Sequence, residues 1–115
     1  MLFRSIARNG ELAAFMDGNG SIYVSGLAKP VNSTPANKIL SIDPYRIVFF
    51  AKADPAAGIP ATRLISLSLD SFAETLASDD VYAACVVGDN VFYISASNRS
   101  QLFEMVPGTR MGVPA

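Results

Sequence analysis

Hydrophobic and polar residues alternate over much of this 115-residue chain, in short runs separated by turn-forming residues. A period of two is typical of strands that bury one face. The pattern predicts strands over residues 2–7, 12–16 and 21–25, joined by turns at Asn9-Gly10 and at residues 17–20. The first third of the chain is therefore expected to form an antiparallel meander.

The most apolar segment spans residues 46–53, where Ile47, Val48, Phe49 and Phe50 follow one another. Apolar residues at both parities indicate a strand that is covered on both faces. Arg46 and Lys52 flank these four residues and are interpreted as gatekeepers against aggregation. Residues 63–69 then alternate cleanly and predict a strand with two different faces.

Two short helices are expected in the second half of the chain. Ser71 and Glu74 have the spacing of a capping box, which predicts a helix that ends near Ser78. Asn98 and Gln101 repeat this spacing and predict a second helix, which ends at Pro107-Gly108 and carries Leu102, Phe103 and Val106.

Between these helices, residues 81–87 and 91–97 form the clearest hairpin pattern of the chain. Gly88-Asp89-Asn90 connects the two strands, and these residue types tolerate a positive φ.

Two other segments carry few strand or helix signals. Residues 28–45 contain three prolines with Asn, Ser and Thr between them, which predicts an extended arm or a long surface loop. Residues 107–115 form a tail with one charge, at Arg110, and it is either a docking arm or a frayed terminus.

Together these elements predict one domain of the α+β class that is rich in β-structure. An antiparallel meander is followed by a β-hairpin with two short helices. The alternative is an all-β sandwich or barrel, in which the two helices are only turns.

Composition adds a surplus of apolar residues that one small core does not explain. Half of the residues are hydrophobic, only 17% are charged, and the mean hydropathy is +0.32. An average domain has about 25% charged residues. We expect part of the apolar surplus to be covered by another protein chain.

Several other destinations for this surplus are disfavoured. No uncharged stretch is long enough for a spanning helix, and Arg4, Arg8 and Glu11 interrupt any signal-peptide core. Scattered basic residues and a net charge of −1 argue against nucleic-acid binding. The expected location is the cytoplasm, or a virion if the protein is viral.

Candidate chemistry is sparse because the chain contains no histidine. Asp17 and Asn19 lie in a segment like the middle of a calcium-binding loop, but a tight turn explains it as well. Asp79-Asp80 is best interpreted as turn residues, and Cys85 as a small buried hydrophobe. We therefore expect no catalytic residue, metal or cofactor.

The leading functional hypothesis is a non-enzymatic structural or assembly protein that self-associates or joins a larger assembly. Small virion components, such as capsid-cementing or tail-assembly subunits, have this physical profile. The alternatives are a monomeric inhibitor or adaptor for one partner, and a small enzyme or ligand-binding domain that uses carboxylates. The expected contact residues are Phe49, Phe50, Tyr82, Phe92, Tyr93, Met105, Val106, Met111 and Val113.

Overall fold

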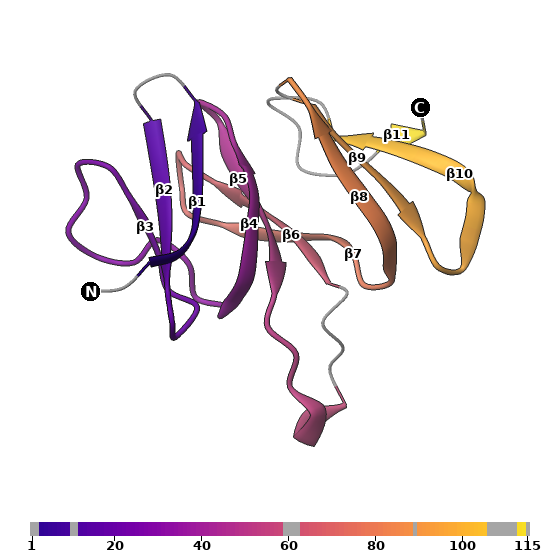
Figure 1. The fold of residues 1–115 in the computed structure, drawn as a ribbon, viewed down its shortest axis with the longest axis horizontal. Coiled ribbons are helices and arrows are strands. Elements are labelled where there is room, and N and C mark those ends of the chain that lie inside the picture. Colours follow the sequence, from indigo (N-terminus) through magenta and orange to yellow (C-terminus); the bar gives the residue numbers. More distant parts are fainter. Residues whose placement is uncertain (1–2, 10–11, 59–62, 89, 106–112, 115) are drawn as a thin grey trace.

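This computed structural model describes residues 3–9, 12–58, 63–88, 90–105 and 113–114. Its strands form three antiparallel sheets (Figure 1). The N-terminal sheet has the order β1-β2-β3, the middle sheet β4-β5-β6-β7, and the C-terminal sheet β11-β10-β9-β8. The strands are β1 (Phe3–Asn9), β2 (Leu12–Asp17), β3 (Ile22–Val24), β4 (Ala36–Ile42), β5 (Arg46–Ala51), β6 (Leu64–Ser68), β7 (Glu74–Ser78), β8 (Val81–Val87), β9 (Asn90–Ser95), β10 (Asn98–Met105) and β11 (Val113–Pro114).

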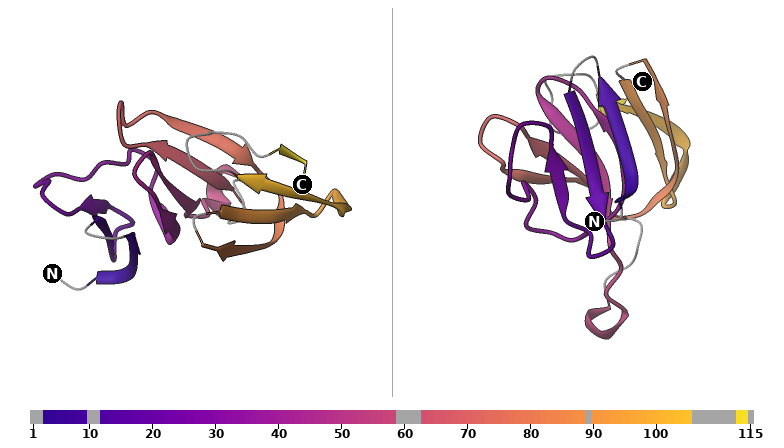
Figure 2. Two further views of the ribbon diagram at one scale, coloured as in Figure 1. Left: turned by 90° about the horizontal axis from the view of Figure 1, so that it is seen from above. Right: turned by 60° about the vertical axis from the view of Figure 1, so that its left-hand side comes forward.

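The middle sheet lies between the other two, and its central strands β5 and β6 are buried on both faces (Figures 1 and 2). On one face, Ile47 and Phe49 of β5 belong to a core shared with the N-terminal sheet. On the other face, Val48 belongs to a second core shared with the C-terminal sheet, and Phe50 packs against it. The predicted two-sided burial of this strand is confirmed.

A buried arginine, paired with Asp43, joins the middle sheet to the C-terminal sheet. Arg46 Nε donates to Asp43 Oδ2 at 3.0 Å, and Arg46 Nη2 donates to the carbonyl of Met105 at 2.6 Å. Asp43 Oδ1 also accepts the backbone N–H groups of Tyr45 and Arg46. Arg46 is only 2% exposed, so its predicted role as a surface gatekeeper is wrong.

Tyr93 of β9 makes a second link across the same boundary. Its ring stacks on Phe103 with centroids 5.3 Å apart, and its hydroxyl donates to the carbonyl of Ala77 in β7 at 3.4 Å. Burial, together with the negative charge of Asp80, raises the pKa of this phenol.

The predicted α+β class is wrong, because the chain is nearly all β and both predicted helices are strands. Residues 74–78 form β7, which pairs with β6, and the Glu74 carboxylate bonds to Ser33 and Thr34 instead of closing a capping box. Such a short helix is marginal in water, whereas a strand here completes the ladder of β6. An all-β sandwich or barrel was the alternative, but most of each segment predicted as a helix is a strand rather than a turn, and the strands form three sheets.

The second predicted helix fails for a different reason. Residues 98–105 form β10, in which Phe103 and Met105 face the second core while Leu102 is exposed. This inward period of two satisfies a strand and not a helix. The chain is nonetheless one compact domain that is rich in β-structure, as predicted.

The proline-containing segment is held against the domain, and part of it is a strand. Residues 36–42 form β4 at one edge of the middle sheet, whereas residues 28–35 and 43–45 lack regular structure. Asn32 fixes the first of these stretches: its Oδ1 accepts the N–H of Ile22 at 2.7 Å, and its Nδ2 donates to the carbonyls of Gly20 and Thr34.

Gly20 allows this segment to approach the β2–β3 turn. Its φ is +81°, and a Cβ there would lie 2.6 Å from the carbonyl oxygen of Ala36. Only glycine meets both requirements. The predicted tight turn at residues 17–20 is confirmed, and it forms the support for the start of β4.

Among the described residues, no helix is long and apolar enough to cross a membrane. Only part of the predicted tail at residues 107–115 belongs to the described residues. Residues 106–112 and 115 lie outside them, whereas Val113–Pro114 form β11 beside β10.

The ion pair at the sheet boundary yields a stability prediction. Changing Arg46→Met should lower the free energy of unfolding by about 3–5 kcal/mol, because the buried Asp43 carboxylate loses its cation. The double variant D43N/R46M removes both charges and should be more stable than R46M alone. Urea unfolding measures both, and a loss below about 1 kcal/mol in R46M would contradict the assigned role.

Candidate functional site

The outer face of the C-terminal sheet is the largest departure from ordinary strand patterning. Inward residues of β8, β9 and β10 enter or pack against the second core, so the alternate residues point outward. We call this outward set the C-terminal face. It consists of Ala83, Cys85, Val87, Phe92, Ile94 and Leu102.

Cross-strand pairing brings these outward side chains into adjoining rows. Leu102 pairs with Ile94, which pairs with Ala83; in the next row Glu104 pairs with Phe92, which pairs with Cys85. A shallow hollow of about 130 Å³ lies in this face. An antiparallel sheet with one face on the core normally presents mainly polar residues on the other, whereas apolar residues predominate on this one.

Charge is sparse on this sheet. The segment from Val81 to Gly88 contains no charged residue. Glu104 adds one carboxylate to the described part of the outer face, and it accepts a hydrogen bond from Asn90 Nδ2 at 3.3 Å. The guanidinium of Arg99 lies over the ring of Tyr82, 4.0 Å from its centroid. This cation–π contact occupies one face of the Tyr82 ring.

The edge of the same sheet is open at β8. This seven-residue strand pairs with β9 on one side, and among the described residues no strand pairs with its other side. Its residues are mostly exposed, with Tyr82 at 58% and Val87 at 63%. The backbone donors and acceptors on that side are therefore available to another strand.

The expected contact residues are distributed between core and surface. Phe49, Tyr93 and Met105 are buried core residues, Phe50 and Phe92 are half-buried, and Tyr82 is exposed. Val106 and Met111 lie outside the described residues. Val113 pairs through its backbone with Glu104.

Cys85 was predicted to be buried, and that prediction is wrong because its thiol is exposed. The hairpin pattern placed Cys85 and Ile94 on strands but did not show which parity faces the core. Leu102 was hidden by its assignment to a helix.

The acidic candidates are engaged in turns. Asp17 Oδ1 accepts the backbone N–H groups of Asn19 and Ser21, each at 3.0 Å. Asp80 accepts the N–H of Ser97 and the hydroxyl of Ser78. Hydrogen bonds from Ser97 hold the pKa of Asp80 below its usual range. Both turn interpretations agree with this geometry.

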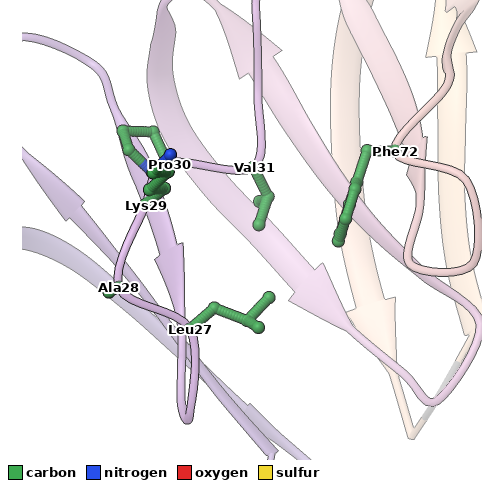
Figure 3. A pocket seen from close by; sticks show the side chains of 6 residues that line it. All are labelled: Leu27, Ala28, Lys29, Pro30, Val31 and Phe72. Carbon is green, nitrogen blue, oxygen red and sulfur yellow. The ribbon is translucent and has the colours of Figure 1, made fainter.

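A second candidate site is an apolar hollow of about 470 Å³ between the segment after β3 and the β6–β7 turn (Figure 3). Leu27 and Val31 face it from the segment after β3, and Phe72 faces it from the β6–β7 turn. Phe72 is 45% exposed and has φ = +58°, the left-handed region that disfavours residues with a Cβ. The chain thus presents an aromatic ring at a strained position.

Glu74 fastens the two walls of this hollow together. Its Oε2 accepts hydrogen bonds from the backbone N–H groups of Ser33 and Thr34, at 2.6 and 3.1 Å, and from the Ser33 hydroxyl. Burial by itself would raise the pKa of Glu74, but the hydrogen bonds from Thr34 and Ser33 outweigh it and lower the pKa.

Comparison of the chain with protein-family models, with curated proteins and with solved structures finds no match. The assignment of function therefore depends on these two surfaces.

Glu74 gives a pH prediction. Because its pKa is lowered from 4.5 in the folded chain, its stabilisation is complete well above pH 4.5 and is lost as the pH falls through the folded pKa. Wild type should exceed E74Q in free energy of unfolding at pH 7, and the difference should shrink by pH 3. An equal difference at both pH values would contradict this role.

Phe72 gives a stability prediction. We expect the free energy of unfolding of F72G to lie within about 1 kcal/mol of the wild-type value, because relief of the left-handed strain offsets the lost side-chain contacts. In contrast, F49A removes a fully buried ring and should lose about 3–5 kcal/mol. A similar loss in F72G would show that Phe72 is a core residue rather than a displayed one.

Proposed function

We propose that this protein is a non-enzymatic assembly subunit that associates with further copies of itself through its C-terminal sheet. The observation that carries the proposal is the apolar C-terminal face beside the uncharged strand β8. In a chain with few charges, this surface is left over after both cores are filled. Such surfaces in soluble proteins usually mark contacts with other chains.

A second copy is the favoured occupant because of the charge pattern. Like charges that face each other across an interface oppose self-association. The segment from Val81 to Gly88 has no charged residue, so two copies of it can approach without this repulsion. An isologous contact uses the same patch on both subunits, so the patch has to be compatible with itself. More specifically, we propose that the protein is a small virion subunit that is located in the cytoplasm before assembly.

The second candidate function is an adaptor that binds one partner protein. It is favoured by Phe72, because backbone strain that displays an aromatic ring over an apolar hollow is typical of functional positions. An enzyme based on carboxylates is the weakest candidate, since Asp17, Glu74 and Asp80 bond to neighbouring loop residues.

The proposal predicts that a charge on β8 weakens self-association. Changing Cys85→Lys places a cation at the centre of the strand, so that lysines of two copies repel each other, and the association constant should fall at least about tenfold. Size-exclusion chromatography with light scattering over a range of concentrations measures the mass.

Leu76→Lys is the matched control, because Leu76 is 47% exposed but belongs to β7 of the middle sheet. L76K should associate as wild type does. A wild-type protein that keeps the mass of one chain up to millimolar concentration would refute the proposal.

A further inference from the structure

The sheet edges of this protein differ in how they are protected. Proteins shield exposed edges with charged residues, with proline, or by keeping the edge strand short. β3 has three residues and β11 has two, one of them Pro114. β4 carries Lys38, β7 carries Glu74, and the sequence of β1 includes two arginines.

β8 has none of these protections. It is seven residues long, contains no charged residue and no proline, and is exposed along most of its length. Its pairing with β9 has one register shift, between Val81 and Ala83, and in the described part of the chain β8 is the one long edge strand without a charge or a proline. A long, apolar, unprotected edge is a template for another strand.

The register shows which backbone groups are available. Val87 pairs with Asn90 across two turn residues, and pairing continues without a shift to Ala83–Ile94. In a two-residue hairpin the first pair is hydrogen-bonded, and bonded and non-bonded pairs then alternate. The N–H and C=O groups of Ala84 and Val86 therefore point away from β9, toward the open edge.

We propose that β8 pairs antiparallel with β8 of a second copy, about a two-fold axis at Cys85. This inference rests on the self-association proposed above. This register bonds Ala84 of each copy to Val86 of the other and uses all four outward groups. It also avoids the shift between Val81 and Ala83. The two C-terminal sheets become one continuous sheet, which joins the C-terminal faces of both copies into a larger apolar surface.

The arrangement puts the two Cys85 residues opposite each other as a non-hydrogen-bonded pair. Their Cα atoms would be about 4.5 Å apart, within the range of a disulfide. Cys85 is the single cysteine of the chain and is exposed, so the unmodified protein carries its own probe. Diamide takes two electrons and two protons from a thiol pair as the disulfide forms.

The experiment is diamide cross-linking of the native protein, read as a dimer band on a non-reducing gel. The matched variant C85S/L102C moves the one cysteine to an exposed outward position on β10, two strands from the edge. Edge-to-edge pairing predicts that the native protein cross-links at least about tenfold faster than this variant. Protein unfolded in urea at the same concentration gives the background from random collision.

A second variant tests the edge through its backbone. Changing Val86→Pro removes one outward N–H from each copy, while the bonds to β9 remain. Two hydrogen bonds are then lost per dimer, and the dimer affinity should fall at least about tenfold. Circular dichroism checks that V86P keeps the fold. If V86P does not fold, the cross-linking experiment alone tests whether β8 pairs with β8 of a second copy.

The outcomes separate this pairing from the function on which it rests. If the protein associates but C85S/L102C cross-links as fast as the native chain, the sheets meet face to face and the edge pairing is wrong, while the assembly function stands. If the folded V86P associates as tightly as wild type, the edge pairing is also wrong. A protein that stays a single chain at every concentration refutes both.

Discussion

Burial of the central strands of the middle sheet on both faces is the constraint on which the rest of this structure depends. Ile47 and Phe49 fill one core, while Val48 and Phe50 contribute to the other, so one short strand supports both outer sheets. Each such side chain contributes about 1.5–3 kcal/mol when it is fully buried. The buried Arg46, which is paired with Asp43, links the middle sheet to the C-terminal sheet, because its guanidinium also donates to the carbonyl of Met105 at the end of β10.

This constraint explains where the apolar surplus of the chain lies. A middle sheet with two apolar faces consumes much of it, and each outer sheet needs only one apolar face. The C-terminal sheet nevertheless has apolar residues on both, with Cys85, Phe92 and Leu102 among those directed outward. The fold of the single chain gives these residues no partner in the core, which is why we assign them to contact with a second copy.

Strand positions were predictable to the extent that a local pattern determined them. The two-faced strand at residues 47–50, the alternation of β6 and the hairpin of β8 and β9 all follow from side-chain period. The helices predicted from Ser71 to Ser78 and from Asn98 to Pro107-Gly108 were wrong because capping signals are local, whereas the demand for a pairing partner comes from the sheet. Arg46 was assigned to the surface because sequence does not show that Asp43 and Met105 enclose it.

The candidate site was predictable only in region. The sequence placed the surplus in the β8–β9 hairpin but assigned the contacts to Tyr93 and Met105, which the second core takes. Which parity of a strand faces inward depends on the sheet that covers it, so Cys85 and Leu102 were assigned to the wrong environment.

Hydrogen exchange of the β8 amides, followed by NMR from micromolar to millimolar concentration, is the direct test of pairing between β8 strands. Such pairing predicts that the amides of Ala84 and Val86 exchange rapidly in dilute protein and are protected progressively as concentration rises, while those of Cys85 and Val87 are protected throughout. Rapid exchange of Ala84 and Val86 at every concentration would contradict it.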